Sequence, residues 1–106
     1  MSAIVNFAMF PLDRGASMAH YVACVVDALD RAGIRYSLGS MATTFEVPTI
    51  EEALHVIALA HNALAAHSDR IYITMNIDSR NTPQQRSDHK VDHVRQILND
   101  NNSSNV

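Results

Sequence analysis

The order in which apolar segments alternate between strand-like and helix-like spacing constrains this chain most. Strands place every second side chain on one face, whereas helices return to one face every three to four residues. The segments follow the order β-α-β-β-α-β, with one more helix at the end. The expected strands are Ala3–Phe10, Ile34–Leu38, Met41–Val47 and Arg70–Asp78, and the expected helices are Ser17–Ala32, Thr49–His67 and one from Ser87 to about Leu98.

Capping residues mark the helix boundaries. Ser17 is a favourable N-cap for the first helix, and Gly33 supplies its C-terminal stop. Thr49 followed by Glu52 forms a capping box that opens the second helix. The spacing predicts buried stripes of Met18, Tyr21, Val22, Val25, Val26 and Leu29 on the first helix, and of Ile50, Leu54, Ile57, His61 and Leu64 on the second.

This element order predicts an α+β, ferredoxin-like fold: a four-stranded antiparallel sheet with two helices on one face and an extra C-terminal helix. Residues 1–98 form the expected single domain, and residues 99–106 are expected to be a disordered polar tail. The helices leave one sheet face open, although the first strand carries apolar side chains on both faces. A second sheet in a homo-oligomer, a dimer or a tetramer, is the expected cover.

Composition excludes several classes of protein. The 106 residues include 11 acidic and 8 basic ones, for a net charge of -3 and without a basic run, which disfavours nucleic-acid binding. The apolar stretches are far shorter than the roughly 20 residues of a membrane helix, and the N-terminus does not resemble a signal peptide. We therefore expect a cytoplasmic protein with no membrane partner.

Familiar cofactor and metal sites are also not expected. Cys24 is the only cysteine, and its place within the first helix predicts an inert apolar role. The three glycines are too few for a phosphate loop or a dinucleotide fingerprint. His89 and His93 stand four residues apart on the last helix with Asp92 nearby, but no third ligand is evident, so no metal site is predicted.

A polar set at strand ends and at a helix start contains the candidate site residues. Glu46 is the least expected of them, because a carboxylate in a β-rich apolar segment must be paired or hydrogen-bonded. An ion pair with Arg70, Arg80 or Lys90 and a role in ligand binding both remain open. The set comprises Ser17, Thr43, Glu46, Asp78 and Arg80, with Tyr21 and Tyr36 as stacking surfaces.

An ordered set of short segments carries a family resemblance: Pro11-Leu12, Ser17 with Tyr21-Val22, Gly33 to Tyr36, Met41 to Glu46, His61, Arg70-Ile71, Ile77 to Arg80, and Lys90-Val91 with Val94. Over about residues 3 to 98, this set resembles the small thiamine-binding proteins of the YkoF-like type. The chain departs from the family pattern where Ala42 and Val47 replace glycines, and where Asn76 and Ser79 replace Lys and Asp.

The resemblance implies binding of thiamine or its aminopyrimidine portion, without catalysis, by an oligomeric ferredoxin-like protein. A thiamine site needs a carboxylate, small hydroxyls and an aromatic or apolar wall. Glu46 would be the carboxylate, Thr43 and Ser17 the hydroxyls, and Tyr36 or Tyr21 the wall. For a phosphorylated ligand, Arg80 and the amides that open the first helix would contact the phosphate.

Two other functions stay open at this level. Glu46 or Asp78 could act as a general acid or base, with Arg80 as an electrostatic clamp, in an enzyme for a small anionic substrate. A regulatory or scaffolding module would instead use the open sheet face for oligomerisation and have no pocket.

Overall fold

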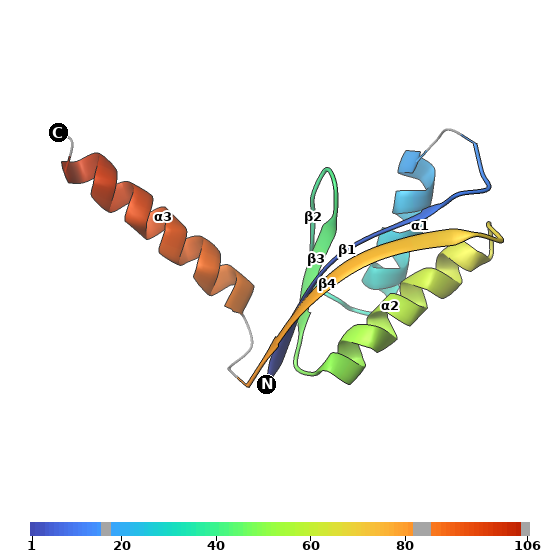
Figure 1. Cartoon of the computed structure of the whole chain (residues 1–106), viewed down its shortest axis with the longest axis horizontal. Coiled ribbons are helices and arrows are strands. Elements are labelled where there is room, and N and C mark those ends of the chain that lie inside the picture. Colours follow the sequence, from blue (N-terminus) through green and yellow to red (C-terminus); the bar gives the residue numbers. More distant parts are fainter. Residues whose placement is uncertain (16–17, 82–85, 105–106) are drawn as a thin grey trace.

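A computed structural model describes the backbone of residues 1–15, 18–81 and 86–104, and the side chains of residues 1–15, 18–81 and 91–101. The elements follow the expected order (Figure 1). They are β1 (Ser2–Pro11), α1 (Met18–Arg31), β2 (Tyr36–Leu38), β3 (Thr43–Val47), α2 (Ile50–Ala65), β4 (Ile71–Arg80) and α3 (Arg86–Ser104).

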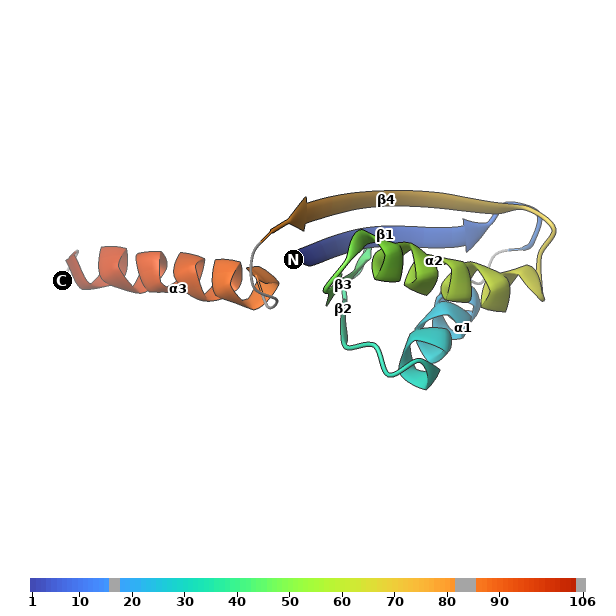
Figure 2. The ribbon, with the colours of Figure 1, turned by 90° about the horizontal axis from the view of Figure 1, so that it is seen from below.

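The four strands form one antiparallel sheet in the order β2-β3-β1-β4, and α1 and α2 lie on the same face of it (Figure 2). This is the ferredoxin-like arrangement that the sequence predicts. β4 pairs with β1 along its whole length, from Ser2↔Arg80 to Pro11↔Ile71. β3 covers only the first part of β1 and ends at the pair Phe7↔Thr43. Among the described residues, no strand therefore lies beside this edge of β1 after Phe7.

The hydrophobic core lies between the sheet and the two helices. Phe7 and Phe45 pack edge to face across the β1–β3 pair, with ring centroids 5.8 Å apart. Val25 and Leu29 of α1 close the core on that side. The fully or nearly buried apolar side chains are Ala3, Val5, Phe7, Met9, Val25, Leu29, Phe45, Val47, Ala53, Val56, Ile57, Ala60 and Leu64.

The buried stripe of α2 differs from the expected one. Ala53, Val56 and Ala60 join Ile57 and Leu64 in the core, whereas the side chain of Leu54 is 47% exposed. The expectation gave weight to large apolar residues. The structure instead directs small ones inward, and alanine permits close packing of the helix because it has little volume. Met18, expected in the stripe of α1, is likewise exposed at 44%.

The predicted caps at Gly33 and Thr49 are confirmed, whereas Ser17 lies outside the described residues. Gly33 has a φ of 71°, in the left-handed region that glycine adopts without steric cost. Its N–H donates to the Asp30 carbonyl at 3.1 Å, and the N–H of Ile34 donates to the Leu29 carbonyl at 3.0 Å, which ends α1. Thr49 caps α2 by accepting the Glu52 N–H at 3.1 Å.

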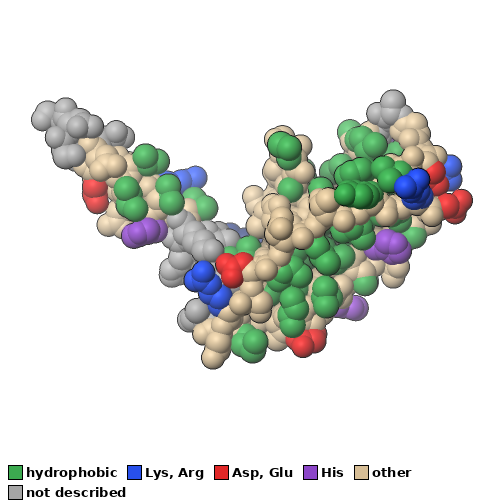
Figure 3. Space-filling model, viewed as in Figure 1, with side chains coloured by type: hydrophobic (Ala, Val, Ile, Leu, Met, Phe, Trp, Pro, Cys, Tyr) green, Lys and Arg blue, Asp and Glu red, His purple; other side chains and the backbone are tan. Residues whose placement is uncertain are grey.

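α3 extends away from the sheet and the other helices (Figures 1 and 2). The expected end near Leu98 is too early, because α3 continues to Ser104, and the segment expected to be a disordered tail is helical over 99–104. Asn, Asp and Ser weaken a helix only modestly, and this segment contains neither Gly nor Pro to break it. Apolar side chains are visible on the surface of α3 (Figure 3), where Val91, Val94, Ile97 and Leu98 are each about half exposed.

Candidate ligand-binding site

The sheet separates the predicted site residues onto two faces. Thr43, Phe45 and Val47 of β3 point toward the helices and are buried. Glu46 lies on the other face, as the strand alternation predicts, and it pairs with Ile4 of β1. Asp78 of β4 pairs with Ile4 from the opposite edge of β1. Within one chain, Thr43 and the two carboxylates therefore cannot contact the same small ligand.

A pocket of about 360 Å³ opens beyond the pair Phe7↔Thr43, where β1 continues without β3 beside it. Its wall on the helix side comes from α1, and its far side comes from the β2–β3 hairpin. This volume is at the lower end of the range for small-molecule sites. The residues that line the pocket are Phe7, Ala8, Met9, Phe10, Met18, Val22, Val25, Leu38, Gly39, Ser40, Met41, Ala42 and Thr43.

The pocket is apolar, with a few polar groups at one side. None of these lining residues is charged, and the side-chain hydroxyls come from Thr43 and Ser40. Thr43 is 7% exposed, and no hydrogen bond of its hydroxyl is found among the described residues. A buried hydroxyl costs free energy unless it is hydrogen-bonded. The Thr43 hydroxyl is therefore suited to bind a ligand that enters the pocket.

The other residues predicted on the helix side do not line this pocket. Tyr21, on α1, is half-buried, and its ring packs edge to face with the His20 ring, with ring centroids 5.6 Å apart. Tyr36 is also half-buried, and burial raises its pKa, with a smaller contribution from its hydrogen bond to Asp30. Ser17 lies outside the described residues, immediately before Met18 in the sequence.

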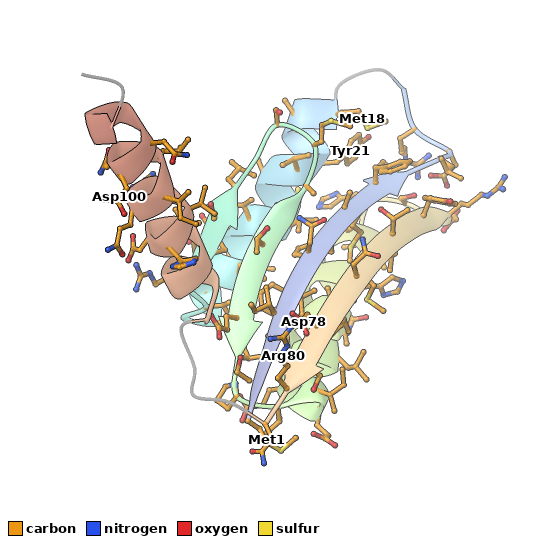
Figure 4. The ribbon with its side chains drawn as sticks, turned by 60° about the vertical axis from the view of Figure 1, so that its left-hand side comes forward. Met1, Met18, Tyr21, Asp78, Arg80 and Asp100 are labelled. Atoms are coloured by element: carbon orange, nitrogen blue, oxygen red, sulfur yellow. The ribbon has the colours of Figure 1, made fainter. Side chains whose placement is uncertain are left out.

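Glu46, Asp78 and Arg80 are brought together on the open face. The Ser2 hydroxyl donates to Oε2 of Glu46 at 2.7 Å, and Nε of Arg80 lies 3.5 Å from Oδ1 of Asp78. Figure 4 places Asp78 and Arg80 toward one end of the sheet, whereas Met18 and Tyr21 lie toward the other. Arg80 lies two residues beyond the expected end of the fourth strand at Asp78, but β4 extends through it because Arg80 pairs with Ser2. We call Ser2, Glu46, Asp78 and Arg80 the open-face cluster.

The loop after β1 is held to the loop before β4. The Asp13 carboxylate accepts a hydrogen bond from the Ser68 hydroxyl and another, at 2.9 Å, from the Asp69 N–H. The bond from Ser68 is the largest influence on Asp13 and lowers its pKa below the ordinary value of 3.8. Arg14 adds a bond from Nε to the His67 carbonyl at 2.7 Å. These contacts fix the end of β1 next to the pocket.

Neither a metal centre nor a membrane span is found in the part of the chain that the structure describes. That part contains no group of three His, Cys, Asp or Glu residues that could hold a metal ion. The His89 side chain is outside the described residues. Among the described helices, none has the length and apolar character to cross a membrane.

Comparison with known proteins identifies the family. The model of the thiamine-binding protein family matches residues 5–95, which is most of the chain. The chain belongs to the thiamine-binding protein family. A UPF0045 protein of Methanothermobacter thermautotrophicus is 36% identical to this family member over 83 residues, which cover 77% of the chain and 84% of that relative. A UPF0045 protein of Synechocystis is 29% identical over 92% of the chain and 81% of that protein.

Solved structures match the fold of this thiamine-binding family member. A hypothetical protein of Methanocaldococcus jannaschii superposes with a TM-score of 0.76 at 22% identity, over 88% of the chain and 95% of that protein. A protein of Thermotoga maritima, proposed to act in thiamine biosynthesis or salvage, gives a TM-score of 0.66 at 18% identity, over 76% of the chain and 85% of that protein. At these identities the likeness establishes the fold. The family itself indicates a role in binding a small molecule.

The pocket was not predicted from the sequence. The spacing of Phe7, Met9, Val22 and Val25 indicates only core positions or one face of a strand. One signal was available in the segment lengths, because the expected hairpin strands are shorter than the first strand. The Ser2 partner of Glu46 was also missed, since Ser2 lies before the expected start of β1.

Proposed function

We propose that this protein binds thiamine, or its aminopyrimidine portion, without catalysing a reaction, and that the pocket between α1 and the β2–β3 hairpin is the binding site. The observation that carries the proposal is the Thr43 hydroxyl. It is buried, lines an apolar pocket of ring-binding size, and lacks a hydrogen-bond partner among the described residues. A flat heterocycle would bury its faces against the apolar walls and hydrogen-bond to Thr43 with its edge.

The family and one structural neighbour support the choice of ligand. The matching family is one of thiamine-binding proteins, and the name of the Thermotoga maritima protein refers to thiamine biosynthesis or salvage. The chemistry of the pocket is compatible with the aminopyrimidine ring more directly than with the thiazolium cation. A cation is favoured by a carboxylate or an aromatic face. The described lining residues contribute the Phe7 ring but no carboxylate, and the Phe10 ring packs with Tyr72 on the open face.

In the proposal, the open-face cluster belongs to a surface where two copies of the chain could meet, and not to the pocket. Glu46 and Asp78 flank Ile4 on the sheet face that the helices leave uncovered. A second copy of the chain packed on this face would bring the cluster into a shared interface, where Glu46, Asp78 and Arg80 could contact a ligand between subunits. The same two carboxylates are the observation that favours the alternative of an acid/base enzyme.

Self-association is part of the proposal. The open face carries the Phe10 and Tyr72 rings, whose centroids are 5.5 Å apart, and Tyr72 is 50% exposed. α3 adds an exposed apolar stripe (Val91, Val94, Ile97 and Leu98). Soluble monomers rarely expose large contiguous apolar patches. A second copy of this chain is the occupant we propose, because both surfaces would be covered at once in a symmetric dimer or tetramer.

Isothermal titration calorimetry with thiamine, thiamine phosphate and free 4-amino-5-hydroxymethyl-2-methylpyrimidine tests the proposal. We expect saturable binding with a Kd on the order of micromolar, or about -8 kcal/mol. Val22→Phe places a ring in the pocket and should abolish binding. Val26→Phe, one turn along on the same helix and outside the pocket lining, is the matched control. Absence of heat with all three compounds, or equal loss in both variants, contradicts the proposal.

A further inference from the structure

Met9 lies on the strand edge that faces the pocket. β3 pairs with β1 only as far as Phe7↔Thr43, whereas β4 continues beside β1 to Pro11↔Ile71. Of the described strands, β4 alone therefore lies beside Met9. It also lines the pocket, together with Thr43.

The hydrogen-bond pattern fixes the direction of the Met9 main-chain groups. Opposed residues in antiparallel strands alternate between hydrogen-bonded and non-hydrogen-bonded pairs. The N–H of Leu12 donates to the Arg70 carbonyl at 2.9 Å, in the same register as the β1–β4 pairs. Met9 is three residues before Leu12, so its pair with Ile73 is a non-hydrogen-bonded one. Its N–H and C=O consequently point away from β4 and toward the pocket.

The hairpin gives the same pattern from the other side. Gly39 N–H donates to the Ala42 carbonyl at 2.9 Å, so Ala42 directs its main-chain groups toward β2. The next residue, Thr43, then directs its groups toward β1, where it is paired with Phe7. The hydrogen-bonded ladder between β3 and β1 thus ends at Phe7. Met9 is the next residue of β1 whose main-chain N–H and C=O point toward the β3 side.

The main-chain groups of Met9 are buried and have no partner within the part of the chain that the structure describes. Met9 is 5% exposed, and no hydrogen bond to its N–H or C=O on the pocket side is found among the residues that the structure describes. More than nine in ten buried main-chain groups in proteins are paired. One donor and one acceptor left open beside the unpartnered Thr43 hydroxyl indicate that a ligand, rather than the protein, completes these bonds.

We infer that Met9 recognises the ligand through its main chain, and that it selects a flat, neutral ring with a hydrogen-bond acceptor next to a donor. The acceptor would bind the Met9 N–H and the donor would bind the Met9 C=O, as the main chain of a partner strand would. The ring nitrogen and adjacent amino group of an aminopyrimidine supply it. The inference rests on the proposed function and names the group that gives it specificity.

An added peptide strand fits this edge less well than a small ring. After Met9, the next residue with main-chain groups on the pocket side is Pro11, which has no N–H. The edge therefore offers only one complete donor–acceptor couple, whereas strand addition depends on a row of them. The side chains of Met18 and Met41, from α1 and the hairpin, also line the pocket beside this edge.

Methionine amide spectra of the full-length protein test the inference. In protein labelled with [¹⁵N]methionine, titration with 4-amino-5-hydroxymethyl-2-methylpyrimidine should move the Met9 amide proton downfield and slow its exchange with solvent. Met75, on β4 and outside the pocket lining, is the internal control and should not move. The analogue without the 4-amino group loses the donor, so it should bind roughly 10- to 100-fold more weakly.

The outcomes separate the two proposals. If the amino compound binds but the Met9 amide is unchanged, or if the analogue binds equally well, the inference about Met9 is overturned and the proposed function stands. If neither compound nor thiamine binds, the proposed function fails and the inference fails with it. A Met9 shift that accompanies selective binding of the amino compound supports both.

Discussion

Thr43 and Glu46 are three residues apart on β3, and their side chains lie on opposite faces of the sheet. Thr43 lines the pocket on the helix side, whereas Glu46 accepts a hydrogen bond from Ser2 on the open face. A motif that looks continuous in the sequence is thus divided between a pocket on the helix side and the opposite sheet face, where Glu46 is half-buried beside the buried Ser2. This division decides which substitutions should affect binding in one chain and which should act through association.

Replacing Thr43 with valine should weaken ligand binding with little effect on folding. Valine keeps the shape and the β-propensity of threonine but removes the hydroxyl. One hydrogen bond contributes about 0.5–1.5 kcal/mol, so the Kd for the aminopyrimidine should rise about 2- to 10-fold in calorimetry. Thr44→Val, on the open face of the same strand, removes the acceptor of an exposed bond from Asn6 and should leave the Kd unchanged.

Glu46→Gln distinguishes a site within one chain from a site shared between two. Because Glu46 is on the face opposite the pocket, the affinity for a ligand in the pocket should change less than twofold. The bond from Ser2 should weaken, because a charged acceptor is replaced by a neutral one. Calorimetry and thermal unfolding of the same samples measure both effects. A tenfold loss of affinity with normal stability would place Glu46 at a ligand site between subunits.

The sequence carried the element order, the caps and the alternation that separates Glu46 from Phe45, because these depend on local spacing and on single residues such as Gly33 and Thr49. The pocket was not predictable in this way. It exists because β3 begins only at Thr43, opposite Phe7, while β1 continues to Pro11, and strand pairing lengths are set by tertiary contacts rather than by local pattern. The buried stripe of α2 was misplaced for a related reason, since alanines such as Ala53 and Ala60 give a weak apolar signal.

The bond between Ser68 and Asp13 should make part of the stability depend on acid. The pKa of Asp13 is lowered in the folded protein, chiefly by Ser68, so this contribution is present above the ordinary value of 3.8 and is lost as the pH falls through the folded pKa. Wild type should have a higher Tm than Asp13→Asn at neutral pH, and the two Tm values should converge as the pH falls below 3.8 and through the folded pKa of Asp13. A difference in Tm that is constant across this range would assign the effect to the shape of the side chain rather than to its charge.

Asp27 supplies the control for that experiment. Its carboxylate makes an exposed ion pair with Arg31 at 3.0 Å within α1. Exposed pairs contribute little to stability. Asp27→Asn should therefore change the Tm much less than Asp13→Asn at every pH. If both variants show the same acid dependence, the effect belongs to the net charge of the protein and not to the contact with Ser68.

A charge placed on the apolar stripe of α3 should break the association that we propose. Val94 is 55% exposed in the single chain and would be buried in an oligomer, where an unpaired carboxylate is costly. Light scattering at micromolar concentration should give an oligomeric mass for wild type and a smaller mass for Val94→Glu. Gln96→Glu adds the same charge on the opposite side of α3, because two residues advance a helix by about 200°, and should keep the wild-type mass. A monomeric wild type would show that neither α3 nor the open face pairs with a second copy.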